Sequence, residues 1–352
     1  MPPLKNNHRS AVLFIAALAL SALLIARPAH AQRKDPEKSA AKSVTPAAQR
    51  VIDRGLALLA SGQHDDGSFG SGNYRGNAAI CGLVGMAFIS GGSTPDRGPY
   101  GRQVSRVVDY LLANTEKSGF IVGSGSSSHG PMYGHGFATL FLAECYGMTK
   151  RPQLREKLSK AVKLIVNTQN KEGGWRYQPR RQDADLSVTI CQVMALRAAR
   201  NAGLYVPKET IDRATKYIKQ CQNADGGFMY MSQGGESGFA RSAAAVVGLQ
   251  SAGIYKGPEI QKALVYLMQF KPEKGVVRRE TYYFYGHYYA AQAMWQAGGD
   301  DWNRWYPAVR DELVARARAD GSWMSPISVD YATAMACIVL QMPNNYLPIF
   351  QR

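Results

Sequence analysis

The chain has 352 residues, of which 45% are hydrophobic, and its 42 Lys and Arg outnumber its 26 Asp and Glu to give a formal net charge of +16. This length is enough for a sizeable core. No stretch combines a basic run with an aromatic platform, which excludes nucleic-acid binding. The five cysteines are odd in number and form no CxxC or Cys/His cluster, which excludes a full disulfide framework and a zinc site. No other metal and no cofactor is predicted.

The first 31 residues have the three features of a secretory signal peptide. Lys5 and Arg9 form a basic start, residues 11–26 form an apolar run, and Ala29-His-Ala31 matches an A-x-A cleavage site. Cleavage near Ala31 predicts export to the periplasm or cell envelope. The alternative is an uncleaved anchor, although the apolar run is short for a spanning helix. No later segment has 18 uninterrupted apolar residues, so we expect no transmembrane span in the mature chain.

Residues 32–45 are polar and are predicted to form a disordered lead-in. Removal of the signal region leaves 39 basic against 26 acidic side chains, a net charge of +13. A basic exported protein is suited to acidic surfaces of the cell envelope, such as anionic lipid or polyanionic sugar. The alternative is that the charge only keeps the outer face solvated.

Two kinds of helical segment alternate after residue 45. The first kind is amphipathic, as in Val104, Val107, Val108 and Leu111, which follow the i, i+3, i+4, i+7 spacing of one helix face. These segments are predicted at 46–61, 99–116, 152–168, 207–221, 257–269 and 302–318. The second kind is apolar on nearly all sides and therefore buried on nearly all sides. These segments are predicted at 78–90, 135–147, 186–200, 239–252, 282–297 and 330–341.

A short signature precedes the apolar segments. Four copies have a Gly-containing turn that ends in an aromatic residue: Gln63-His-Asp-Asp-Gly-Ser-Phe69, Gln169-Asn-Lys-Glu-Gly-Gly-Trp175, Gln222-Asn-Ala-Asp-Gly-Gly-Phe228 and Ala319-Asp-Gly-Ser-Trp323. Glycine permits the positive φ of a tight turn, the Gln amide can bond backbone groups at a helix end, and the aromatic ring plugs the space beneath. Asp185 and Asp330 directly precede apolar segments, which is a favoured N-cap position.

Six pairs of helices predict an all-α fold, an (α/α)6 toroid over residues 46–352, with the apolar helices inside and the amphipathic helices outside. An open solenoid is the alternative, but it would need polar capping repeats, and none is visible. Tyr133-Gly-His135 recurs as Tyr285-Gly-His287, as though one block of three repeats were used twice. In a ring of six, His135 and His287 are then expected to face each other across it.

The Gln-x(3)-Gly-x-Trp/Phe units resemble the QW repeats of squalene–hopene cyclases and, more broadly, the prenyltransferase/squalene-oxidase repeat superfamily. The resemblance runs from about residue 46 to residue 342 and implies an α/α toroid. Toroids of this kind also serve protein prenyltransferases, which bind zinc through Asp, Cys and His, and thioester proteins, which need Cys-Gly-Glu-Gln. This chain has no matching zinc-ligand set, and Leu83 follows Cys81-Gly82, so both of these functions are rejected.

Resemblance to the cyclases implies class II terpene cyclisation, an isomerase-type reaction in which the middle Asp of an Asp-x-Asp-Asp motif protonates an alkene. Here Asp183-Ala-Asp185 matches the first two acids, with Asp185 as the proton donor, but Leu186 replaces the last Asp. The loss of a neighbouring acid puts strong-acid chemistry in doubt, so the activity is altered or vestigial. The alternative is that Asp185 only caps its helix.

An apolar, isoprenoid-like ligand in a central cavity is the binding partner that the resemblance implies. Aromatic rings line cyclase cavities and stabilise cations, and a dense aromatic cluster includes the candidate ligand-binding residues Tyr282, Tyr283, Tyr285 and Tyr289. Plain core packing is the alternative for this cluster. Arg176 and Arg181 flank the Asp pair and can hold an anion, or else belong to a solvated loop.

Two other functions stay open. His135 and His287, each in a repeat beside an Asp-containing repeat, are candidates for acid–base catalysis, as in a polysaccharide-acting toroid enzyme. Their alternative role is structural hydrogen bonding. A non-catalytic binding or scaffold protein of the cell envelope is the remaining class.

Overall fold

The computed structural model describes residues 43–123, 130–276 and 282–351, so the predicted signal peptide and most of the predicted lead-in lie outside the described residues. The described residues contain twelve α-helices, three short 3₁₀ turns and no β-strand. All twelve helices belong to one compact unit. Among these helices, none combines the length and the apolar character needed to cross a membrane.

The helices form two layers. The amphipathic helices form the outer layer: α2 (Pro46–Ser61), α4 (Gly101–Ala113), α6 (Leu154–Thr168), α8 (Lys208–Gln220), α10 (Pro258–Met268) and α12 (Gly299–Arg316). The apolar helices form the inner layer: α3 (Ala78–Ser90), α5 (Pro131–Tyr146), α7 (Leu186–Asn201), α9 (Phe239–Ser251), α11 (Tyr283–Ala297) and α13 (Val329–Gln341). All twelve predicted helices are therefore present, within a few residues of their predicted bounds.

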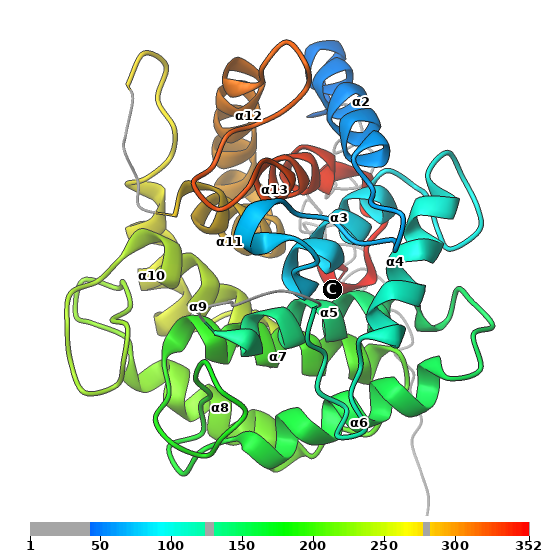
Figure 1. Cartoon of the computed structure of the whole chain (residues 1–352). Coiled ribbons are helices and arrows are strands. Elements are labelled where there is room, and N and C mark those ends of the chain that lie inside the picture. Colours follow the sequence, from blue (N-terminus) through cyan, green and yellow to red (C-terminus); the bar gives the residue numbers. More distant parts are fainter. Residues whose placement is uncertain (1–42, 124–129, 277–281, 352) are drawn as a thin grey trace, which may run out of the picture. The chain divides into compact units, whose positions relative to one another are not determined.

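The two layers close into rings. Each inner helix packs against the inner helices before and after it, and α13 packs against α3 in the same way. In the outer layer, α12 contacts α2. Figure 1 shows the blue α2 meeting the orange α12 and the red α13, so that the two ends of the helical sequence join. The predicted (α/α)6 toroid is confirmed.

Two helices begin several residues earlier than predicted. Helix α5 begins at Pro131 rather than at residue 135, because proline is well suited to the first helical position, where its missing N–H costs no hydrogen bond. Helix α12 begins at Gly299 rather than at residue 302 and continues through Pro307. At the start of α2, Thr45 caps the helix by accepting a hydrogen bond from Ala48 N, so this end of the predicted lead-in already contacts the ring.

Each signature turn rests on the next outer helix. Gly173 has a φ of 102°, and a Cβ there would lie 2.3 Å from the carbonyl oxygen of Arg213 in α8. Gly321 meets Arg54 of α2 in the same way, which fastens the sixth repeat to the first. The aromatic residues that end the four turns are all at most 1% exposed: Phe69, Trp175, Phe228 and Trp323. Glycine at these turns therefore permits both the positive φ and the close approach.

The signature Gln bonds backbone groups at a helix end, as predicted, and that helix belongs to the next repeat. Gln169 Nε2 donates to Gly173 O at 2.8 Å and to Thr210 O at 2.9 Å, so it closes its own turn and also holds the first turn of α8. Gln63 and Gln222 make the same pair of bonds with their own turns and with α4 and α10. The Gln amide therefore links consecutive repeats.

Replacing Gln169 with Ala is expected to lower the free energy of unfolding by about 2 kcal/mol, because two buried carbonyl groups lose their donor. Urea unfolding of the purified variant measures this loss. Gln63→Ala is the matched control and should cost less, since its bonds are only partly buried. Equal, negligible losses at both positions would show that the amide does not couple the repeats.

Candidate functional site

The segments that lead into the inner helices meet at one end of the ring, which we call the N-terminal mouth. Met132 N donates to Tyr177 O at 3.1 Å, and Leu186 N donates to Tyr230 O at 2.9 Å, so neighbouring entry segments are bonded to one another. Five tyrosines along this mouth are only half-buried: Tyr74, Tyr133, Tyr177, Tyr230 and Tyr285. The mouth therefore offers aromatic rings and hydroxyl groups together.

Asp185 lies beneath these tyrosines at the start of α7. Its Oδ1 accepts from Val188 N at 2.9 Å, which confirms the predicted N-cap. Its Oδ2 lies 3.9 Å from Arg176 Nε and near the Tyr230 hydroxyl, and no described atom hydrogen-bonds it in standard geometry. Burial raises the pKa of Asp185 to about 6, against the lowering effects of the Val188 amide, Arg176 and Tyr230. This carboxyl therefore changes charge near neutral pH.

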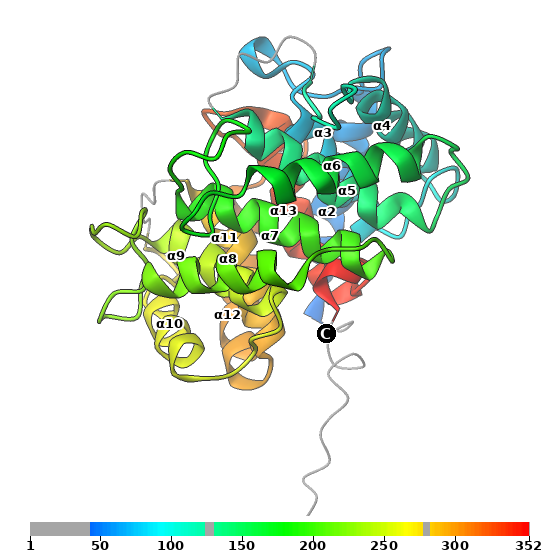
Figure 2. The same cartoon turned by 90° about the horizontal axis from the view of Figure 1, so that it is seen from below.

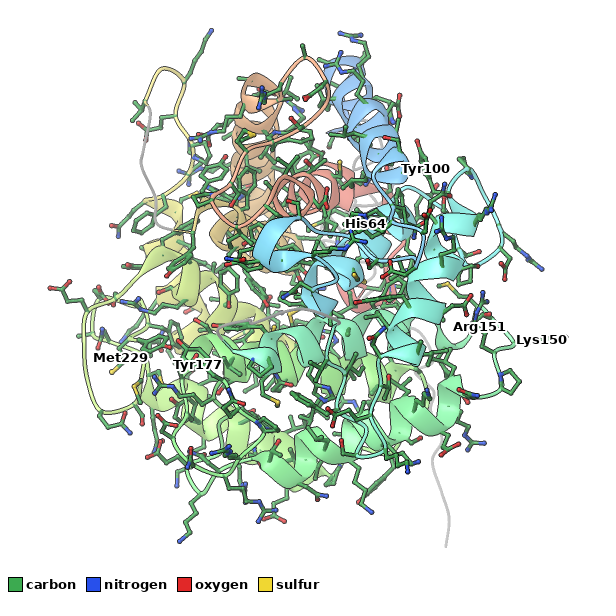
Figure 3. All side chains as sticks on the ribbon, viewed as in Figure 1. His64, Tyr100, Lys150, Arg151, Tyr177 and Met229 are labelled. Atoms are coloured by element: carbon green, nitrogen blue, oxygen red, sulfur yellow. The ribbon has the colours of Figure 1, made fainter. Side chains whose placement is uncertain are left out.

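Arg176 and two tyrosines cover Asp185. The guanidinium pairs with Asp183 at 2.6 Å, and its central carbon lies 5.1 Å from the Tyr177 ring and 5.9 Å from the Tyr230 ring. The Tyr177 and Tyr230 hydroxyls are 2.6 Å apart. Figure 3 labels Tyr177 close to Met229, the residue before Tyr230. The predicted residues Asp183, Asp185 and Arg176 thus form one cluster with Tyr177 and Tyr230.

Tyr285 and Tyr133 extend this cluster towards α11 and α5. The Tyr285 hydroxyl lies 3.5 Å from Ser187 O, and the Tyr133 and Tyr177 rings are 6.3 Å apart. Burial raises the pKa of Tyr133 and of Tyr285 well above the ordinary value, so both hydroxyls stay neutral. Below Tyr285, the predicted ligand-binding residue Tyr289 packs against it at 4.7 Å and is fully buried.

The axis of the ring is filled by side chains from opposite repeats. Phe137 of α5 and Tyr288 of α11 meet edge to face with ring centroids 6.3 Å apart. Tyr289, beside Tyr288 at 4.9 Å, approaches Cys191 of α7 to 3.9 Å. All four side chains are at most 5% exposed. These four side chains therefore occupy the axis between α5, α7 and α11, where a central cavity was predicted.

The two predicted catalytic histidines do not face each other across the ring. His135 Nδ1 accepts from Ile121 N, and its Nε2 lies 3.2 Å from Ala161 O of the outer helix α6. Burial lowers the pKa of His135 to about 4, so the ring is neutral. His287 packs 5.8 Å from Trp305 of the outer helix α12. Because helical spacing turns both rings towards the outer layer, neither joins the cluster around Asp185.

Three other predicted site residues also lie apart from the cluster. Tyr282 is 68% exposed and has a left-handed backbone conformation. The Tyr283 hydroxyl donates to Glu312 of α12 at 3.0 Å, which directs it outwards. Arg181 donates to Asn167 O beside the end of α6.

Asp330, the counterpart of Asp185 in the sixth repeat, is not the N-cap that was predicted. Ser328 caps α13 by accepting from Tyr331 N at 3.1 Å. Asp330 instead accepts from Gly70 N at 2.7 Å and ties the first repeat to the sixth. Asp330 is therefore a structural carboxylate inside the first turn of α13, whereas Asp185 is an N-cap with one oxygen that has no standard hydrogen bond.

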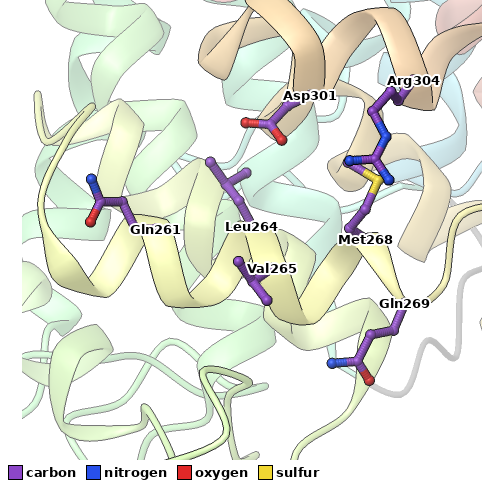
Figure 4. A pocket seen from close by; sticks show the side chains of 7 residues that line it. All are labelled: Gln261, Leu264, Val265, Met268, Gln269, Asp301 and Arg304. Atoms are coloured by element: carbon purple, nitrogen blue, oxygen red, sulfur yellow. The ribbon is translucent and has the colours of Figure 1, made fainter.

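A groove on the outer wall is remote from this chemistry. It has a volume of about 510 Å³ and runs between α10 and α12, as Figure 4 shows. The lining side chains are Gln261, Leu264, Val265, Met268, Gln269, Asp301 and Arg304. These side chains belong to the outer helices and do not lie at the N-terminal mouth, so the groove is not part of the candidate site. Within the described ranges, no three His, Cys, Asp or Glu side chains are placed to share a metal ion.

Tyr177 and Tyr230 were not predicted, yet the sequence contains a signal for them. Each lies two residues after the aromatic residue of its signature turn, as Trp175-x-Tyr177 and Phe228-x-Tyr230. The turn buries the aromatic ring, and the Tyr two residues later bonds the start of the preceding inner helix: Tyr177 O accepts from Met132 N of α5, and Tyr230 O accepts from Leu186 N of α7. A Tyr two residues after the aromatic residue of the turn therefore lies at the N-terminal mouth.

Comparison with known proteins agrees with this architecture. Residues 102–278 match the family model described as the prenyltransferase alpha-alpha toroid domain. No curated protein matches the sequence. Among solved structures, a variant of the type II terpene cyclase MstE from Scytonema, bound to its product merosterolic acid A, is similar with a TM-score of 0.62 and 14% identity, over 86% of this chain and 98% of the cyclase.

Two carbohydrate-related toroids are about as similar. An inactive α-1,6-mannanase of Salegentibacter sp. in complex with α-1,6-mannotriose has a TM-score of 0.62 and 8% identity, over 84% of this chain and 98% of the mannanase. Cellobiose 2-epimerase from Bacillus thermoamylovorans has a TM-score of 0.61 and 13% identity, over 85% of this chain and 99% of the epimerase. At these identities the likeness concerns the fold alone.

Proposed function

The chain belongs to the prenyltransferase α-α toroid family, and we propose that it is an exported member whose N-terminal mouth binds a saccharide and whose Asp185 exchanges a proton with it. One observation supports this most strongly. Asp185 is fully buried, which destabilises its charged form. One of its oxygens nevertheless has no standard hydrogen bond among the described residues and faces Arg176 and Tyr230. Shifted carboxyls of this kind are typical of acid–base catalysts.

The pKa of about 6 suits proton transfer to oxygen at neutral pH. In its neutral form the Asp185 carboxyl donates its proton to the glycosidic oxygen of the saccharide as the bond from that oxygen to the anomeric carbon breaks, and a water molecule adds to that carbon and releases a proton. The carboxylate that results is stabilised by the Arg176 guanidinium and the Tyr230 hydroxyl, and a proton from water restores the acid. A raised carboxyl pKa serves the same purpose in the general acids of glycosidases.

The surroundings of Asp185 favour a hydroxylated ring as the ligand. Half-buried tyrosines offer flat apolar faces for the C–H side of a sugar and hydroxyl groups for its edges. Phe137 and Tyr288 meet on the axis of the ring and occupy space that a long apolar chain would need. Two toroids of similar fold, the mannanase and the cellobiose epimerase, are named for saccharides.

Binding requires the cover of Asp185 to open. The carboxyl has no exposed surface while Arg176 pairs with Asp183 and the Tyr177 hydroxyl bonds that of Tyr230. About a quarter of the Arg176 side chain is exposed, and the residue lies between α6 and α7. It can therefore turn towards a ligand without unfolding either helix. The saccharide would then replace the paired groups as the partner of Arg176 and Tyr230.

Isoprenoid cyclisation is the second candidate, favoured by the Asp183-x-Asp185 match and by the similar fold of the terpene cyclase MstE. Two features weigh against it. A carbocation formed beside Asp185 would be repelled by the Arg176 guanidinium, which lies 3.9 Å from the carboxyl. An acid with a pKa of about 6 is also weak for protonating an alkene.

The test is a parallel binding and turnover assay on the mature protein. Manno-, cello-, chito- and uronic-acid oligosaccharides form one set of probes, and squalene and a geranylgeranyl phenol form the other. Binding is measured by saturation-transfer NMR, and products by chromatography with mass spectrometry. Asp330→Asn is the matched control for Asp185→Asn, since it makes the same change in an acid at the start of another inner helix, α13, whose carboxylate bonds Gly70 N.

Saccharide turnover by the wild type and by Asp330→Asn, but not by Asp185→Asn, is the expected result. Conversion of an isoprenoid with the same dependence on Asp185 would replace the saccharide proposal with cyclisation. Absence of binding and turnover with both sets of probes would overturn the enzymatic proposal.

A further inference from the structure

The opposite end of the ring carries a set of buried polar side chains. Each of the six inner helices contributes at least one polar residue from its last two turns, and the following are at most 7% exposed: Ser90, Glu144, Arg197, Gln250, Gln296 and Gln341. Buried polar groups are costly unless they find hydrogen-bond partners. A ring of six such groups therefore calls for a polar partner at this end.

The partner in this structure is a segment of the chain itself, residues 345–351, which we call the closing segment. Glu144 Oε2 accepts from Ile349 N at 3.2 Å, and Arg197 Nη2 donates to Gln351 O at 2.8 Å. Gln296 Nε2 and Trp295 Nε1 both donate to Phe350 O. These four bonds join side chains of the ring to main-chain atoms of the segment, as in sites that recognise a peptide backbone.

Two adjacent apolar side chains anchor the segment. Ile349 and Phe350 are 3% and 2% exposed, and the space left beside them measures about 10 Å³, room for one water at most. Figure 2 shows the red segment after α13 at one edge of the helices. The segment begins at Asn345, whose left-handed φ of 54° marks a sharp bend in the chain.

The fit is close but leaves polar atoms unsatisfied. Ser90 Oγ and Gln250 Oε1 are buried with no hydrogen-bond partner among the described residues. Burial also raises the pKa of Glu144 to about 7, although the Ile349 amide and Arg197 oppose this. The ring end is therefore more polar than the closing segment requires, which is characteristic of a binding site more than of a core.

We propose that this end of the ring is a peptide-binding site, which the chain fills with its own closing segment and which accepts a peptide of the same kind from another molecule. The ligand is a short peptide with two adjacent apolar side chains, held by main-chain bonds to Glu144, Arg197 and Gln296. The site is independent of the saccharide proposed at the N-terminal mouth.

The first test uses a chain that ends at Asn344 and a fluorescent peptide of residues 344–352. Anisotropy is expected to show saturable binding, weakened at least tenfold when Ile349 and Phe350 of the peptide are both replaced by Ser. The ring variant Glu144→Ala should weaken binding of the unmodified peptide. A folded, shortened chain that binds the wild-type and Ser-substituted peptides equally poorly would overturn the proposal.

Hydrogen exchange on the full chain decides the question even if the shortened chain does not fold. The amide of Ile349 is expected to exchange through local opening, faster than amides in the middle of α5 and α7. Excess free peptide should accelerate exchange in the chain's own closing segment by competing for the ring end. Exchange of Ile349 only together with the inner helices, unaffected by peptide, would contradict the proposal.

Discussion

Replacing Asp185 with Asn is expected to stabilise the protein at pH 7.5 while lowering its turnover at least about 100-fold. Burial raises the pKa of this carboxyl from 3.8 to about 6, so the folded protein at neutral pH holds a charge that costs up to about 3 kcal/mol. Asn removes that charge and still caps α7, because its amide oxygen can accept from Val188 N. A substitution that stabilises the fold but lowers the activity is typical of a strained active site.

The pH dependence of this gain follows from the direction of the pKa shift. Between about pH 4 and pH 6 the folded wild type binds more protons than the unfolded chain, so its stability falls as the pH rises through this window. The neutral Asn variant has no such loss. The difference between the two proteins should therefore be absent below about pH 4 and complete above about pH 6.

Urea unfolding of both proteins at several pH values measures this difference. Asp183→Asn is the control, because its carboxyl is half exposed and its removal breaks the ion pair with Arg176 without relieving burial. No stabilisation is expected there. If Asp185→Asn were less stable than the wild type above pH 6 and turned over normally, Asp185 would be a structural cap and nothing more.

The ring was predictable because it depends on burial, which leaves a strong pattern in the sequence. A helix such as α3, apolar on every side, must be enclosed, and six of them alternating with amphipathic helices can be enclosed by one another and by the amphipathic helices around them. The bounds were less predictable where local effects decide them. Pro131 starts α5 one turn before the apolar pattern does, and nothing in the periodicity shows this.

The candidate site was only partly predictable. Asp185 was found because an acid before an apolar helix is conspicuous, and Arg176 because it lies nearby in sequence. His135 and His287 were placed in the correct repeats but on the wrong side of their helices, since a motif does not say which face meets the axis. That Phe137 and Tyr288 meet across the ring depends on two repeats far apart in the chain, which no local pattern can show.

Replacing Trp323 with Ala is expected to lower the free energy of unfolding by about 3–5 kcal/mol. The side chain is fully buried, its Nε1 donates to Leu313 O at 2.9 Å, and its ring lies against Gly55 of α2. Trp323 therefore fills the junction where the sixth repeat meets the first. Trp323→Phe should cost only about 1–2 kcal/mol, because Phe69 and Phe228 fill the same position in other repeats.

Comparison with Trp175→Ala tests whether the ring is closed in solution. Trp175 plugs the third repeat, donates to Ile165 O at 2.8 Å and is equally buried. In a closed ring no repeat is terminal, so the two Ala variants should lose similar stability in urea and each unfold in one transition. In an open stack the sixth repeat would be an end and would fray separately from the others. Trp323→Ala could lower the free energy of unfolding by less than about 1 kcal/mol while Trp175→Ala lowers it by the full amount. That result would mean that the contact between α12 and α2 does not hold the ring shut.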